Sequence, residues 1–67
     1  MEINDNDILK LERNNFIATY KVIKIEDKMV TIQQLSSTFP DNNPNNQHGF
    51  IQTVDSYILE CNGLVKI

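Results

Sequence analysis

The chain has 67 residues, of which 40% are hydrophobic and 22% are charged, and it carries a formal net charge of −3 at pH 7. At this length only about 60% of the unfolded surface is buried on folding, so we expect a single domain over residues 1–67 with a small core. The net negative charge argues against strong binding to the phosphate backbone of nucleic acids, which requires clustered Lys and Arg.

The first apolar pattern of the chain falls at residues 7–12, DILKLE. A helix over about residues 5–13 places Ile8 and Leu11 on one face, whereas a strand places Leu9 and Leu11 on one face. The strand is favoured, because the Arg-Asn-Asn sequence that follows then forms a compact turn into the next apolar stretch.

Residues 16–35, FIATYKVIKIEDKMVTIQQL, predict two strands joined by a polar turn at residues 26–28. β-branched and aromatic residues on both sides of the turn suit a pleated, half-buried surface. In the first of these strands the apolar face switches near Val22 and Ile23. This switch indicates a bulge or a strong bend, because one extra residue turns every later side chain to the opposite face.

The second strand of this pair covers residues 28–35 and alternates between apolar and polar residues. The alternation predicts that Val30 and Ile32 point into the core and that Thr31 and Gln33 point outward. Three strands joined by short turns form a meander, and a long bent strand lets such a sheet curl and close.

Residues 36–48, SSTFPDNNPNNQH, predict a long polar loop with two prolines and four asparagines. Proline lacks the ladder donor, and Asn and Asp favour turns over strands. A loop of this length in a compact domain is uncommon and is usually functional or disordered. Its one aromatic residue, Phe39, either folds back as a lid or stands exposed.

The C-terminal part again has the pattern of a sheet. Residues 50–54 predict a strand, and a turn at Asp55-Ser56 leads to residues 57–61, which predict another. Asn62-Gly63 then lies between two apolar runs, which predicts a tight hairpin with a type I′ turn leading into a last strand at residues 64–67. The apolar final residue indicates that the C-terminus pairs within the sheet.

The predicted fold is therefore all-β. Five or six short antiparallel strands are expected to form a small SH3-like barrel or a strongly bent sheet. The alternative is an α+β fold, in which a helix at about residues 5–13 packs against a four-stranded sheet.

The sequence contains one histidine, His48, and one cysteine, Cys61. A single cysteine allows no intrachain disulfide and no cysteine-based metal site. A nucleophilic cysteine needs a basic partner, and no third residue is visible that would orient His48 for that role. We therefore expect a solvated loop histidine, a cysteine that fills apolar space, and a protein without catalytic activity, metal or cofactor.

A long polar loop on a small scaffold, without a catalytic constellation, predicts a non-enzymatic module that binds another protein. The binding surface is expected at an exposed strand edge or at the loop, with candidate contacts at Phe39, Asn43, Asn45, His48 and Phe50. For these residues, core packing and a plain linker are the competing interpretations. A phage-type inhibitor or modulator of a host protein fits the size and the Asn-, Ile- and Lys-rich composition, which is typical of a phage or a low-GC bacterium.

Two other functions remain open. A small barrel that binds single-stranded nucleic acid would combine an aromatic residue with a basic face, and the candidates are Tyr20, Lys21, Lys24 and Lys28. Acidic residues interleave with these lysines and favour a mixed, solvated face. The other alternative is a homodimer or larger homo-oligomer whose edge strands pair between chains.

The N-terminal residues, MEINDNDILK, are acidic and polar where a signal peptide has a basic region followed by an apolar one. The sequence has no apolar run near the roughly 18 residues that span a membrane. We therefore expect a cytoplasmic protein with no membrane partner.

Overall fold

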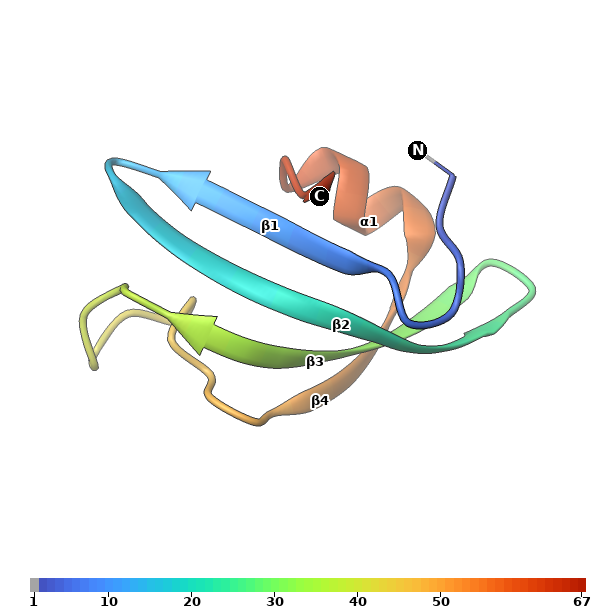
Figure 1. Ribbon diagram of the computed structural model, residues 1–67, viewed down its shortest axis with the longest axis horizontal. Helices are drawn as coiled ribbons and strands as arrows, with labels where there is room; N and C mark the ends of the chain where they lie inside the picture. Colours follow the sequence, from blue (N-terminus) through green and yellow to red (C-terminus); the bar gives the residue numbers. More distant parts are fainter. Residues whose placement is uncertain (1) are drawn as a thin grey trace.

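The computed structural model describes residues 2–67, which form five strands and one short helix. The elements are β1 (Ile8–Arg13), β2 (Phe16–Glu26), β3 (Met29–Ser37), β4 (Ile51–Asp55), α1 (Ser56–Cys61) and β5 (Val65–Lys66). The strands form one antiparallel sheet in the order β4-β3-β2-β1-β5 (Figure 1). The protein is a mostly-β small domain with an open sheet. The predicted barrel is wrong, because β4 and β5 end the sheet on opposite sides and do not pair.

The structure decides between the two interpretations of the N-terminal segment. β1 is a strand, and its alternation buries Leu9 and Leu11 opposite Tyr20 and Ala18 of β2. The turn between the strands consists of two asparagines with φ values of 52° and 70°. Asn tolerates this left-handed conformation better than most residues, and two-residue hairpin turns require it. The alternative N-terminal helix is therefore wrong.

The predicted irregularity in β2 is confirmed. The register with β3 shifts between Val22 and Lys24, so Ile23 is the extra residue. Before the shift the buried side chains are Ala18, Tyr20 and Val22, and after it Ile25 packs against the core while Ile23 is exposed.

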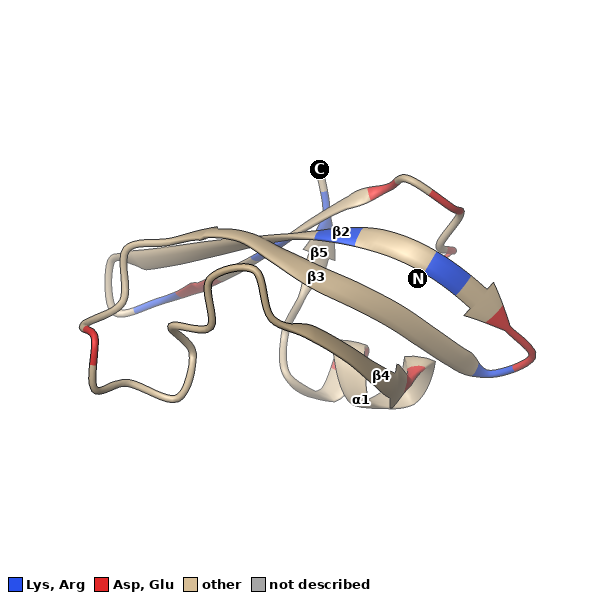
Figure 2. Ribbon diagram, turned by 90° about the horizontal axis from the view of Figure 1, so that it is seen from below, with Lys and Arg blue, Asp and Glu red and all other residues tan. Residues whose placement is uncertain are grey.

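The core lies on one face of the sheet, which we call the inner face. It comprises Leu9, Leu11, Ala18, Tyr20, Val22, Val30, Ile32, Phe39, Leu59 and Leu64. The predicted inward positions in β3 are confirmed by the burial of Val30 and Ile32. On the opposite, outer face the hydroxyl of Thr31 bonds that of Thr53 at 2.8 Å. Figure 2 shows α1 and the loop between β3 and β4 on the same side of the sheet, where they cover parts of the inner face.

The predicted strand at residues 57–61 and the hairpin after it are wrong, because residues 56–61 form α1. Asp55 caps this helix, and its Oδ1 accepts a hydrogen bond from the N–H of Tyr57 at 2.9 Å. At the other end Gly63, with φ 82°, donates to the C=O of Glu60, and Leu64 donates to the C=O of Leu59. This pair of bonds is a Schellman motif, so Asn-Gly ends a helix here instead of turning a hairpin.

The expectation that the C-terminus joins the sheet is confirmed, although its partner strand differs from the one predicted. β5 pairs with β1, with Lys66 opposite Leu9 and Val65 opposite Lys10. The N–H of Ile67 donates to the C=O of Ile8 at 3.0 Å. The last residues therefore extend the sheet beyond β1.

Asp7 ties this C-terminal strand to the start of the chain. Its Oδ2 accepts the N–H of Asn4 at 2.7 Å and lies 3.2 Å from Nζ of Lys66. The backbone hydrogen bond, with a smaller contribution from Lys66, lowers the pKa of the Asp7 carboxyl below its usual value. A carboxyl with a lowered pKa in the folded state stabilises that state above its unfolded pKa, and the stabilisation is lost as the pH falls through the folded pKa.

We therefore expect the urea midpoint of the wild-type protein to fall as the pH is lowered below about 4, the region where a free aspartate protonates. Asp7→Asn should show a smaller fall over the same range, because its side chain does not ionise. Urea unfolding followed by circular dichroism between neutral and acidic pH measures this difference. Asp5→Asn, two residues away, is the matched control and should keep the wild-type profile.

Candidate functional site

A buried amide, that of Gln34, connects the loop between β3 and β4 to the sheet. This side chain is 2% exposed. Its Nε2 donates to the C=O of Asn45 at 2.8 Å and to the hydroxyl of Tyr20 at 3.2 Å, and its Oε1 accepts from the N–H of Gln47 at 2.6 Å. The backbone C=O of Gln34 also accepts from Gly49 at 3.0 Å. Gln34 therefore makes the largest set of side-chain hydrogen bonds from the strand to the loop, and the buried ring of Phe39 holds the start of the loop against the core.

The asparagines of the loop also bond within it. Oδ1 of Asn43 accepts from the N–H of Asn45 at 2.8 Å. Nδ2 of Asn46 donates to the C=O of Phe39 and to Oδ1 of Asp41, both at 3.1 Å. Since Asn and Asp side chains stabilise turns through such bonds, the asparagine-rich sequence builds the loop itself.

The structure separates the five residues predicted for protein binding. Phe39 folds back into the core, where it is 6% exposed and its ring centroid lies 5.5 Å from that of Phe16. Asn43 and Asn45 are half-buried in the loop, whereas His48 is exposed and Phe50 is 55% exposed next to β4. Only His48 and Phe50 therefore present their side chains fully at the surface beside this strand.

The residues of the nucleic-acid alternative do not share one face. Tyr20 is 5% exposed on the inner face, while Lys21, the next residue of the strand, lies on the outer face. Lys24 pairs with Glu26 at 2.9 Å, and this pairing raises the pKa of the lysine and lowers that of the glutamate. Lys28 is exposed in the turn before β3. Figure 2 shows basic and acidic residues close together at that end of β2.

The single cysteine and histidine lie apart from any cluster of similar groups. Within residues 2–67, no three His, Cys, Asp or Glu side chains come together as metal ligands would. Cys61 is exposed at the end of α1, so the expectation that it fills apolar space is wrong. It bonds the Tyr57 hydroxyl, and this bond raises the pKa of the tyrosine.

The described chain holds no helix with the length and apolar character that crossing a membrane requires.

The sequence did not reveal which strands would lie at the edges of the sheet, and these are β4 and β5. The N–H of Gln34 donates to the C=O of Phe50 at 3.1 Å just before β4 begins. In an antiparallel ladder, every second residue counted from such a pair has its backbone N–H and C=O directed at the neighbouring strand. Gln52 and Val54 therefore bond to β3. The backbone groups that point away from β3, at the open side of the sheet, belong to Ile51 and Thr53.

This open edge lacks the features that usually block strand pairing. Natural edge strands are commonly protected by lysine, by proline or by a bulge. β4 has the sequence IQTVD, with no lysine, no proline and no register shift, and its one charged residue, Asp55, is at its end and caps α1. The opposite edge, β5, is only two residues long and includes Lys66. Of the two edges, β4 is thus the one able to accept a further strand.

Comparison with protein-family models, curated proteins and solved structures finds no match.

Proposed function

We propose that this protein is a non-enzymatic protein-binding module that takes an extended segment of its partner as an added strand along β4. The observation that carries the proposal is the row of outward backbone groups on an unprotected edge strand of five residues. Strand addition of this kind gains affinity from main-chain hydrogen bonds, while side-chain contacts on alternate residues give specificity. It needs no catalytic group and no cofactor.

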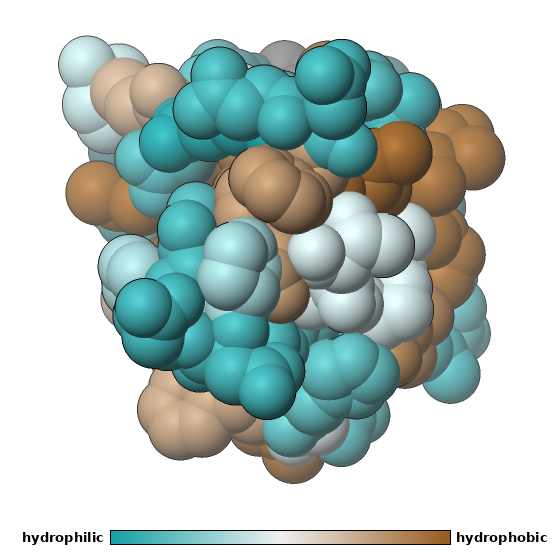
Figure 3. Space-filling view, turned by 90° about the vertical axis from the view of Figure 1, so that its left-hand side faces the viewer, coloured by the Kyte–Doolittle hydropathy of each residue, from teal (hydrophilic) through white to brown (hydrophobic). Residues whose placement is uncertain are grey.

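Apolar side chains beside the edge support this proposal. Phe50 and Ile51 are 55% and 54% exposed. Figure 3 faces the end of the molecule that carries the loop and shows brown hydrophobic atoms along one flank, whereas teal polar atoms cover much of the remaining surface. An added strand with apolar residues at alternate positions would cover Ile51 while its backbone bonds Ile51 and Thr53.

Thr53→Pro tests the edge directly, because proline removes the outward N–H and leaves the bonds of Gln52 and Val54 to β3 in place. We expect the variant to fold and to bind the partner at least about tenfold more weakly than the wild type does. Thr53→Val is the matched control, since it removes the same hydroxyl, which bonds Thr31, but keeps the backbone donor.

The measurement is capture of proteins from the source lysate by immobilised wild type, followed by titration of the captured partner against both variants. Retention by wild type and by Thr53→Val, with loss in Thr53→Pro, supports strand addition at β4. Equal binding of all three proteins would contradict it. If light scattering shows a dimer that Thr53→Pro dissociates, the added strand comes from a second copy of this chain.

A further inference from the structure

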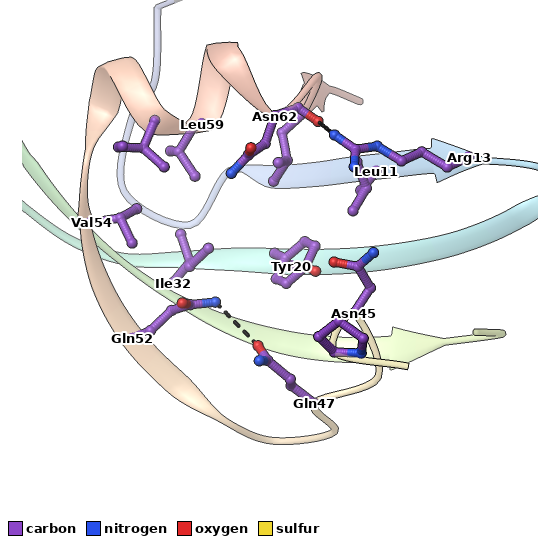
Figure 4. Close-up of a pocket in the computed structure, with 13 residues that line it drawn as sticks. Leu11, Arg13, Tyr20, Ile32, Asn45, Gln47, Gln52, Val54, Leu59 and Asn62 are labelled. Carbon is purple, nitrogen blue, oxygen red and sulfur yellow. Dashed lines mark hydrogen bonds between the residues drawn. The ribbon is translucent and has the colours of Figure 1, made fainter. Parts of the chain in front are cut away.

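The inner face of the sheet carries a cleft that the proposed strand addition does not use. The cleft has a volume of about 210 Å³ and lies between α1 and the loop, above the middle of the sheet (Figure 4). Its lining combines the apolar side chains of Leu11, Ile32, Val54, Leu59 and Leu64 with polar groups, which include Gln47, Gln52 and Asn62. Because a cavity of about 150 Å³ holds a benzene ring, the cleft is large enough for one ring or branched aliphatic group, and its mixed lining suits a group that also carries a polar substituent.

A buried hydroxyl with an unused proton lines this cleft. Tyr20 accepts a hydrogen bond from Nε2 of Gln34 at 3.2 Å, and within residues 2–67 its own proton has no acceptor. Figure 4 shows the hydroxyl oxygen turned toward the side-chain amide of Asn45. That amide forms no bond of its own within the same residues. A buried hydroxyl gains from an acceptor, so an occupant with an acceptor oxygen is favoured here.

The cation at the rim of the cleft lacks a counter-ion. Nη2 of Arg13 donates to the backbone C=O of Asn62 at 2.7 Å, which holds the guanidinium beside the cleft (Figure 4). Arg13 forms no ion pair with any carboxylate in residues 2–67. No acidic side chain lines the cleft. Since a guanidinium has five N–H donors, most of those of Arg13 remain available.

We propose that this cleft binds a small carboxylate with an apolar body of about one ring. The carboxylate takes the hydrogen bonds of Arg13, Tyr20 and Asn45, and the apolar body rests on the leucine-lined walls. The geometry of guanidinium matches a carboxylate, which accepts two parallel N–H bonds. The same chemistry is offered by a free organic acid and by the C-terminal residue of a polypeptide.

The test is an NMR titration of the full chain with 3-phenylpropanoate and with its neutral isostere 3-phenylpropanamide. We expect the acid to bind saturably, with a Kd of about 1 mM or tighter, and to shift resonances of the cleft residues. The amide should bind at least about tenfold more weakly, because charge-assisted hydrogen bonds are roughly twice as strong as neutral ones.

Arg13→Gln should weaken binding of the acid about tenfold and leave the amide unchanged. Lys10→Gln is the matched control, because it removes the same charge from the outer face and should bind the acid as wild type does. Thr53→Pro should also bind the acid normally, so failure of this proposal is distinguishable from failure of strand addition at β4. Tyr20→Phe, if its spectrum shows a native fold, should also weaken binding of the acid.

Two peptides identify the source of the carboxylate. If an N-acetylated peptide ending in Phe with a free carboxylate binds more tightly than 3-phenylpropanoate, and its amidated form does not, the ligand is a polypeptide C-terminus. If only the free acid binds, the ligand is a small organic acid. The proposal is overturned if acid and amide bind equally, if Arg13→Gln has no effect on the acid, or if the acid produces no saturable shifts.

Discussion

Replacing Gln34 with alanine is expected to lower the free energy of unfolding by about 2–4 kcal/mol. The side chain is buried and makes three hydrogen bonds, to Tyr20, Asn45 and Gln47. Its removal leaves the N–H of Gln47 without this partner, and it leaves the C=O of Asn45 with only the longer bond from Oγ of Ser37 at 3.3 Å. An unpaired buried group costs about 1–3 kcal/mol. The alanine also leaves a gap at the join between the loop and the sheet.

Gln33→Ala is the matched control for this prediction. Gln33 is the preceding residue of β3, but its side chain lies on the outer face and forms one exposed bond, to the C=O of Gly49 at 3.2 Å. We expect this variant to lose less than about 1 kcal/mol. Urea unfolding measures both variants, and amide hydrogen exchange should show faster opening of residues 45–50 in Gln34→Ala alone. Equal losses in the two variants would contradict the anchoring role of Gln34.

The first three strands were predictable because the signals that specify them are local. Alternation places Val30 and Ile32 inward, and the change of parity at Val22 marks the bulge. The same alternation also points Gln34 inward, so a signal for the buried amide was present in the sequence. What the pattern does not contain is the partner of that amide, because the loop residues it bonds lie 11 and 13 positions further along the chain.

The C-terminal part was mispredicted because one dipeptide serves two structures. Both a type I′ turn and a Schellman motif need positive φ at the glycine, and Gly63 supplies it in either case. Two features decide for the helix. Asp55 caps the first turn. Leu59 and Leu64, the residues that a Schellman motif brings together, are both buried.

The open sheet, the free edge at β4 and the cleft could not be predicted from the sequence, and the reason is the same for all three. Each depends on which strands are neighbours over long separations. β5 lies next to β1 and β4 next to β3, so the two ends of the sheet stay apart. Arg13 and Asn62 meet at the cleft although they are 49 residues apart. No local pattern encodes that meeting.

Leu59→Ala should have the other large effect, a loss of about 2–5 kcal/mol in the free energy of unfolding. Leu59 is 2% exposed and is the one buried residue of α1. A helix of six residues is too short to be stable alone, so its packing through this side chain keeps it folded. For a domain of this length the total stability is roughly 3–10 kcal/mol, so the substitution removes a large share of it.

Ile58→Ala removes the same three carbons from the adjacent helical position, where the side chain is 44% exposed. It should cost less than about 1 kcal/mol, because most of that surface remains in water in the folded state. Urea unfolding compares the two variants. If Leu59→Ala were no more destabilised than Ile58→Ala, α1 would not be held by its leucine. The helical wall of the cleft would then depend on its other supports, which are the buried side chain of Leu64, the pairing of β5 with β1 and the bond from Arg13 to Asn62.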